Sequence, residues 1–122
     1  MRDIEFRGKR IDNGQWVYGC INIMQNGNTY IFHYSTQFAV IPETVGQCTG
    51  LLHDKNGKKG YEGDILEIKS LNYPQRVVFY DKECCFLLVS LKTGMHYGID
   101  EGMNPCKIIG NIYDNPELLR EE

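Results

Sequence analysis

The segment RVVFYDKECCFLLVSL, residues 76–91, decides the fold class of this chain. It holds two apolar runs, 76–81 and 85–91, which are rich in β-branched and aromatic residues. The polar residues Lys82 and Glu83 lie between them. Runs of this length and composition on either side of a short polar break are typical of two antiparallel strands joined by a turn. We therefore predict a β-hairpin here.

Short strand patterns separated by turn residues continue on both sides of this hairpin. The turns are predicted where Asn, Asp and Gly cluster, because these residues accept the backbone angles that tight turns require. Only residues 116–119, which begin with a proline, have the pattern of a helical turn. We predict a mainly β fold with further strands at 3–7, 15–23, 29–34, 38–41, 64–68 and 106–112, and turns at 12–14, 26–28 and 54–57.

The organisation of the chain changes between residues 42 and 62, where strand alternation lapses and glycines concentrate. The charge is also uneven. Residues 1–60 contain seven Lys/Arg and five Asp/Glu, a net of +2, whereas residues 61–122 contain six and eleven, a net of -5. We predict an N-terminal β-meander over residues 1–44 packed on a C-terminal barrel over residues 45–122. A single continuous domain over residues 1–122 stays open as an alternative.

Composition excludes several classes of protein. At 122 residues and 14.1 kDa, the chain has room for one domain with its own core. No apolar run approaches the ~20 residues that span a bilayer, and the alternating segment 1–7 does not resemble a secretory signal. An odd number of cysteines without a Cys-x-x-Cys pair predicts free thiols and a cytoplasmic location. These residues are Cys20, Cys48, Cys84, Cys85 and Cys106.

Catalytic patterns are absent from the sequence. His33, His53 and His96 are too far apart along the chain to form a local metal-binding pair. There is no glycine-rich phosphate loop and no Gly-x-Ser-x-Gly nucleophile motif. We therefore expect no catalytic residues, no metal, no cofactor and no enzymatic activity, while a site assembled through space from distant residues remains an alternative.

The thirteen aromatic residues divide into two groups. Large apolar rings usually belong to cores, whereas a tyrosine tolerates a half-wet position and is common at interfaces. We expect the tyrosines to be the better candidates for an interface. The rings predicted to lie in the core are Phe6, Trp16, Phe32, Phe79 and Phe86.

Three sequence blocks together resemble the YopX family of phage and prophage proteins. The first is MRDIEFR (residues 1–7) with NGQWVYG (13–19), the second lies within 45–65 and includes VGQCTGL, DKNGK and YEGDI, and the third is IIGNIYDNPELL (108–119). The resemblance departs from the family pattern at Cys48 and near residues 52–53. It implies a β-rich protein with an SH3-like barrel in its C-terminal part and implies no reaction.

A candidate interaction surface follows from the central block. The polar, irregular stretch 47–50 is predicted to be a tight turn that joins the two halves of the chain, and exposed loops often carry recognition residues. The neighbouring segment 54–61 adds charged residues. The predicted surface consists of Gln47, Thr49, Asp54, Lys55, Lys58, Lys59 and Tyr61.

Two functions remain open from the sequence. The first is a non-enzymatic interaction or assembly module that binds its own copies or a protein partner, without a membrane. The second is a nucleic-acid-associated SH3-like module of phage or mobile elements, an analogy from fold alone. Its phosphate contacts would come from Arg2, Arg7, Arg10, Lys55, Lys58 and Lys59.

Overall fold

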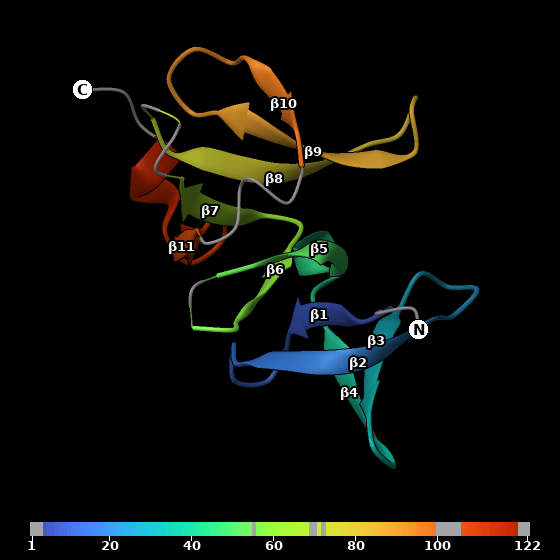
Figure 1. The fold of residues 1–122 in the computed structure, drawn as a ribbon. Helices are drawn as coiled ribbons and strands as arrows, with labels where there is room; N and C mark the ends of the chain where they lie inside the picture. The colour runs from blue at the N-terminus through green and yellow to red at the C-terminus, as the bar shows by residue number, and fades with distance from the viewer. Residues whose placement is uncertain (1–3, 55, 69–70, 72, 100–105, 120–122) are drawn as a thin grey trace. The chain divides into compact units, whose positions relative to one another are not determined.

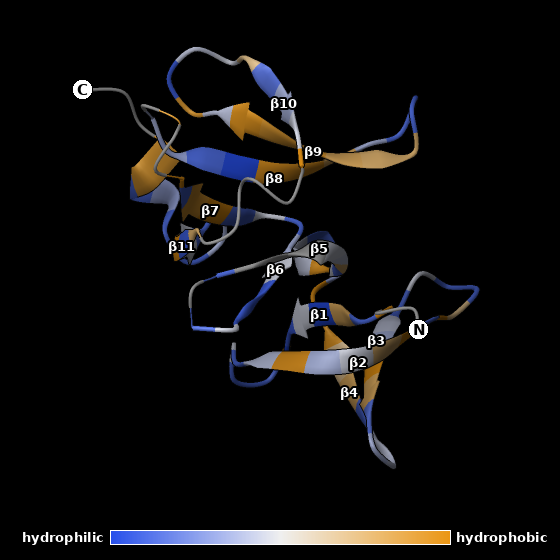
Figure 2. Ribbon diagram, viewed as in Figure 1, coloured by the Kyte–Doolittle hydropathy of each residue, from blue (hydrophilic) through white to orange (hydrophobic). Residues whose placement is uncertain are grey.

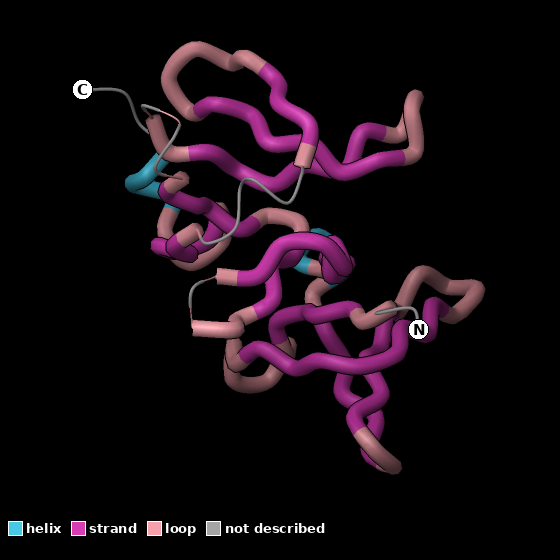
Figure 3. The backbone as a smooth tube through the Cα atoms, in the orientation of Figure 1, coloured by secondary structure: helices cyan, strands magenta, loops and turns pink. Residues whose placement is uncertain are grey.

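The computed structural model describes residues 4–54, 56–68, 71, 73–99 and 106–119. The chain divides into two compact units, Met1–Cys48 and Thr49–Glu122, which are described separately below. Antiparallel strands account for most of both units (Figures 1 and 3). The prediction of a mainly β fold is therefore confirmed.

The first unit is a sheet in which the first four strands pair consecutively and the fifth pairs with the first. Its elements are β1 (Phe6–Lys9), β2 (Trp16–Ile23), β3 (Thr29–His33), β4 (Thr36–Val40), the short 3₁₀ helix η1 (Pro42–Thr44) and the start of β5 (Gly46–His53). The strand order is β4-β3-β2-β1-β5, and the sheet continues from β5 to the short strand β6 (Lys59–Tyr61). Gly14 and Gly27 have φ of +72° and +91°, which confirms the predicted turns at 12–14 and 26–28.

The sheet of the first unit curls until β1 and β4 meet. Arg10 and Val40 form an isolated antiparallel bridge. The N–H of Ile11 donates to the Ala39 carbonyl at 3.0 Å, and the N–H of Ile41 donates to the Lys9 carbonyl at 2.8 Å. Val40 is fully buried as a result.

The second unit contains an open five-stranded sheet with the order β10-β9-β8-β7-β11. Its strands are β7 (Asp64–Glu67), β8 (Gln75–Tyr80), β9 (Cys85–Ser90), β10 (His96–Gly98) and β11 (Lys107–Asn111). The remainder of β5, the short strand β6 (Lys59–Tyr61) and the 3₁₀ helix η3 (Pro116–Leu119) complete the unit. The predicted hairpin is β8–β9, paired from Gln75 and Ser90 to Tyr80 and Cys85, and the predicted helical turn is η3.

The core of the second unit is formed by apolar side chains of β7, β8 and β9, together with Ile68 and Cys106. Leu66, Val77 and Leu88 are at most 1% exposed. The hydropathy colouring shows the same concentration on β7 and β9 (Figure 2). The alternating residues of these strands therefore supply the core, as the sequence pattern predicts.

Two predictions about the chain's architecture need adjustment. The tight turn expected at 47–50 is wrong, because these residues lie inside the extended strand β5. Strands β6 and β10 were not predicted. Among the described residues the five-stranded sheet has β10 and β11 as open edges and does not close, so the SH3-like barrel stays a prediction.

Candidate functional site

Three of the seven residues of the predicted interaction surface are part of the internal framework of the second unit. Asp54, Thr49 and Tyr61 are buried, at 9%, 9% and 5% exposure. The Asp54 carboxylate accepts hydrogen bonds from the backbone N–H groups of Asn56 and Lys58, each at 2.9 Å. This carboxylate therefore holds the turn that follows β5 and is not available to a partner.

A second carboxylate acts in the same way two strands later. Oδ2 of Asp64, which is 2% exposed, accepts a hydrogen bond from the Tyr61 N–H at 2.8 Å. This carboxylate therefore holds the turn between β6 and β7. Cys106 forms a parallel bridge with Asp54. Burial, and then the negative charge of Asp54, raises the pKa of the Cys106 thiol, so the thiol stays neutral and suits a structural position.

The other members of the predicted surface do not complete an exposed patch. Gln47 is half-buried and pairs with Phe6 in the first unit. Lys58 is exposed and Lys59 is half-buried in the second unit. Lys55 lies outside the described residues. Among the described members of the predicted surface, Lys58 is therefore the exposed one.

An exposed aromatic cluster lies instead at the β3–β4 turn of the first unit. We call Phe32, His33 and Tyr34 the aromatic tip. Tyr34 is 93% exposed and has a φ of +57°, and its ring packs edge-on against His33 with 4.5 Å between centroids. A nitrogen of the His33 ring lies 2.9 Å from the carbonyl oxygen of Tyr18. The prediction of a core position for Phe32 is wrong, since it is 39% exposed.

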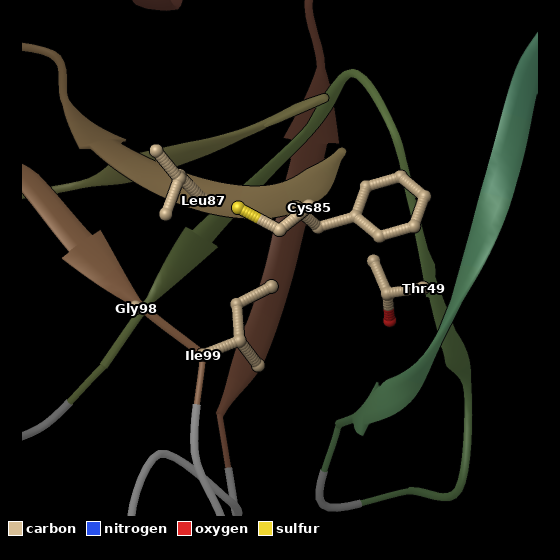
Figure 4. A pocket seen from close by; sticks show the side chains of 6 residues that line it. Thr49, Cys85, Leu87, Gly98 and Ile99 are labelled. Carbon is tan, nitrogen blue, oxygen red and sulfur yellow. The ribbon is translucent and has the colours of Figure 1, made fainter. Parts of the chain in front are cut away.

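The second unit carries an apolar pocket of about 400 Å³ (Figure 4). The thiol of Cys85 and the side chains of Leu87 and Ile99 lie around it. Cys85 and Leu87 alternate along β9 and so share one face of the sheet. The pocket is large enough to receive a side chain, and its full lining is Thr49, Cys85, Phe86, Leu87, Gly98 and Ile99.

Two of the cations proposed for phosphate contacts are packed on aromatic rings. The Arg7 guanidinium lies 4.5 Å from the centre of the Trp16 ring, and that of Arg10 lies 4.5 Å from the centre of Phe38. Arg10 Nε also donates to Asp12 at 2.9 Å. This hydrogen bond lowers the pKa of the Asp12 carboxyl. Arg2 lies outside the described residues.

The described residues contain neither a metal-binding cluster nor a membrane-spanning helix. In the described ranges, no three His, Cys, Asp or Glu residues come together in a way that could hold a metal ion. His96 lies against the Tyr80 ring, with 6.1 Å between centroids. No helix among the described residues has the length and apolar character needed to cross a membrane.

A family model described as YopX protein matches residues 4–120. The chain belongs to the YopX family. This confirms the resemblance carried by the three sequence blocks. No curated protein matches the chain.

Two solved structures share the YopX-type fold of this chain. Protein EF1440 from Enterococcus faecalis is 19% identical, with a TM-score of 0.59 over 98% of this chain and 100% of its own. The yopX protein from Bacillus subtilis is 17% identical, with a TM-score of 0.56 over 100% of this chain and 99% of its own. At sequence identities of 19% and 17%, these matches show that the folds are similar.

The sequence offered a weak signal for the aromatic tip of this YopX-family protein. The loop between β3 and β4 consists of Tyr34 and Ser35, without the Gly or Asn that usually occupies a two-residue hairpin loop. A large aromatic residue at such a position is uncommon. This departure from turn chemistry could have marked Tyr34 before the structure was known.

Proposed function

We propose that this YopX-family protein is a non-enzymatic assembly module whose aromatic tip binds another copy of the chain. The observation that carries the proposal is the 93% exposed Tyr34 at a φ of +57°. For a residue other than Gly this conformation costs about 1–2 kcal/mol. An exposed ring regains little of that energy by packing within its own chain. Tyrosine at such a position is therefore suited to contact with a partner, where it is often a major contributor to binding.

The apolar pocket supplies a receptor of matching chemistry. It is lined by Phe86, Leu87 and Ile99 and has a volume of about 400 Å³. Met1–Cys48 contains four Lys/Arg and four Asp/Glu, whereas Thr49–Glu122 contains nine and twelve. Met1–Cys48 therefore has no net charge and Thr49–Glu122 is acidic. The first unit of one copy can approach the second unit of another copy without like-charge repulsion. Insertion of the tip of one copy into the pocket of the next is a head-to-tail contact.

Sedimentation velocity of the full chain over a range of concentrations tests the assembly. Wild-type protein is expected to associate with increasing concentration. Tyr34→Gly, which fits the turn and removes the ring, should weaken association at least tenfold. Tyr34→Phe, which keeps the ring, should associate like wild type. A wild-type protein that stays monomeric up to about 1 mM, a concentration that detects even weak contacts, would refute self-association.

A mixing experiment tests the head-to-tail geometry. Leu87→Gln should weaken association by making the pocket polar. A mixture of Tyr34→Gly with Leu87→Gln should form dimers, because one copy keeps an intact tip and the other an intact pocket. If each variant alone is monomeric and the mixture is also monomeric, the tip does not bind this pocket.

A nucleic-acid-associated role in phage or mobile-element biology is the second candidate. It is favoured by the cations around Trp16, where Lys9 Nζ lies 5.7 Å from the ring centre and the Arg7 guanidinium 4.5 Å. Aromatic rings combined with positive charge can hold single strands by stacking. Binding to single-stranded DNA or RNA that weakens with salt would support this role. The absence of binding at low salt would exclude it.

Location and origin belong to the same proposal. The five cysteines are free thiols, which is consistent with a reducing cytoplasm. The YopX resemblance suggests a phage or prophage origin. Recovery of the protein in the cytoplasmic fraction, with all thiols reactive after unfolding, would support the location.

A further inference from the structure

A second pocket in the Thr49–Glu122 unit has a buried amide at its base. It has a volume of about 320 Å³ and lies beside the paired residues Gln75 and Ser90. Tyr73, Met95 and Tyr97 are among its walls. We call it the Gln75 pocket. Its polar base and aromatic walls distinguish it from the apolar pocket.

Gln75 holds an unused hydrogen-bond acceptor at this base. The side chain is 1% exposed, and its Nε2 donates to the Tyr73 carbonyl at 2.7 Å. That bond orients the amide and determines which of its atoms is the oxygen. Gln75 Oε1 has no hydrogen-bond partner among the described residues. A buried acceptor without a partner is unfavourable, and a donor supplied by a ligand would satisfy it.

Ser90 places a hydrogen-bond donor next to this acceptor. Its Oγ accepts hydrogen bonds from the backbone N–H groups of Lys92 at 3.3 Å and Thr93 at 3.2 Å. The hydroxyl hydrogen of Ser90 therefore remains for another acceptor. Leu91 N–H donates to the Pro74 carbonyl at 3.0 Å. The adjacent pair, Gln75 and Ser90, is therefore of the non-hydrogen-bonded type, in which side chains lie closer together. The base thus presents an acceptor beside a donor.

The walls and rim indicate what kind of molecule carries the complementary pair. Tyr73 is 40% exposed, and the Lys92 ammonium lies 5.4 Å from the centre of its ring. Aromatic walls favour a planar ring, and a cation at the rim favours an anionic substituent. Nucleobases present a donor beside an acceptor on one planar edge and stack on tyrosine.

We propose that the Gln75 pocket binds the base of a nucleotide, independently of the assembly function. A base N–H donates to Gln75 Oε1, the neighbouring base acceptor receives the Ser90 hydroxyl, and the phosphate lies near Lys92. Oε1 is buried in the free protein. Binding therefore requires an exposed wall to move aside, and Met95, at 57% exposure, is the most accessible.

NMR titration of the full chain with UMP, CMP, AMP and GMP tests the pocket. At least one nucleotide should produce saturable chemical-shift changes for residues of β8 and β9. Gln75→Met should weaken the binding of that nucleotide at least tenfold. Should Gln75→Met fail to fold, Tyr73→Ser removes an exposed stacking ring with little risk to the core. If no nucleotide binds at millimolar concentration, or if a folded Gln75→Met variant binds like wild type, the proposal is wrong.

Matched control variants distinguish binding in the Gln75 pocket from effects elsewhere on the protein. Met95→Ala should alter nucleotide affinity, whereas Met24→Ala, at 48% exposure in the other unit, should not. Lys92→Gln should weaken binding of the nucleotide but not of its nucleoside. A short single-stranded oligonucleotide that binds more tightly than the mononucleotide identifies an unpaired base of a strand as the source. Equal or weaker binding identifies a free nucleotide.

Discussion

A Cβ atom on Gly19 of β2 would lie 1.7 Å from the carbonyl oxygen of Phe32 on β3. The two backbones approach at a distance that only glycine permits. Because that oxygen belongs to the main chain, it can move only if the strands separate. The pairing of β2 with β3 therefore depends on the absence of a side chain at position 19.

We expect Gly19→Ala to destabilise the protein by more than about 3 kcal/mol, in the range of severe backbone clashes. Urea denaturation measures the change. Gly27→Ala is the control in the same unit, because its Cβ would meet nothing within 4 Å while its φ of +91° still opposes alanine. The control should cost about 1–2 kcal/mol. Equal losses from the two substitutions would contradict the clash.

The Asp54 carboxylate should be a measurable contributor to stability. Asp54→Ala removes the acceptor of two backbone N–H groups and should cost about 1–3 kcal/mol. Asp54→Asn keeps an oxygen at Oδ1 and should lose less than half as much. Thermal unfolding of the three proteins gives the comparison. If the alanine and asparagine variants lose the same stability, the hydrogen bonds to Asn56 and Lys58 are not the cause.

The buried thiol of Cys106 should make the free energy of unfolding depend on pH in the alkaline range. Its pKa is raised in the folded protein by burial and by Asp54, whereas an unfolded thiol ionises near pH 8.5. The contribution of the neutral Cys106 thiol to the free energy of unfolding is therefore complete below about pH 8.5. It is lost as the pH rises toward the pKa of the folded state, by at most about 1.4 kcal/mol per pH unit.

Cys106→Ala provides the test of this pH dependence. The variant loses packing at every pH, so the informative quantity is the slope of unfolding free energy between pH 8 and about pH 10, near the ordinary thiol range. The slope should be less steep in the variant than in wild type. Identical slopes would show that Cys106 ionises equally in both states.

The cysteines should differ in their reactivity toward a thiol reagent. Cys20 and Cys84 are exposed, whereas Cys48 and Cys106 are buried. Brief alkylation of the folded protein at pH 8, followed by peptide mass spectrometry, should label the exposed pair first. Modification of the buried pair should follow the rate of unfolding and accelerate in urea. Early modification of Cys106 would be inconsistent with its position in the core.

Local pattern was sufficient for much of the fold. The β8–β9 hairpin was predictable because its strands are rich in β-branched and aromatic residues, and the turn at 54–57 because Gly57 accepts a φ of +82°. Strand β5 was not, because glycines and polar residues interrupt its alternation. Its extended form depends on pairing with β1 at Gly46 and Gln47, which lie far from β1 along the chain.

Little of either candidate site was predictable, for a different reason. Charge and irregularity favoured Asp54 and Lys58 as surface residues, yet an aspartate that accepts backbone N–H groups has the same local sequence as one that meets a partner. Gln75 gives no signal by itself. Its importance arises from its burial opposite Ser90, which is a property of the paired strands.

The bridge between Arg10 and Val40 has a consequence for the form that self-association can take. An exposed strand edge is a template for endless addition of further strands and leads to fibres. Near Val40, the edge of β4 is already occupied by the backbone of residues 9–11. Addition of a further strand at this part of β4 is therefore blocked, and growth into amyloid-like aggregates from this edge is suppressed.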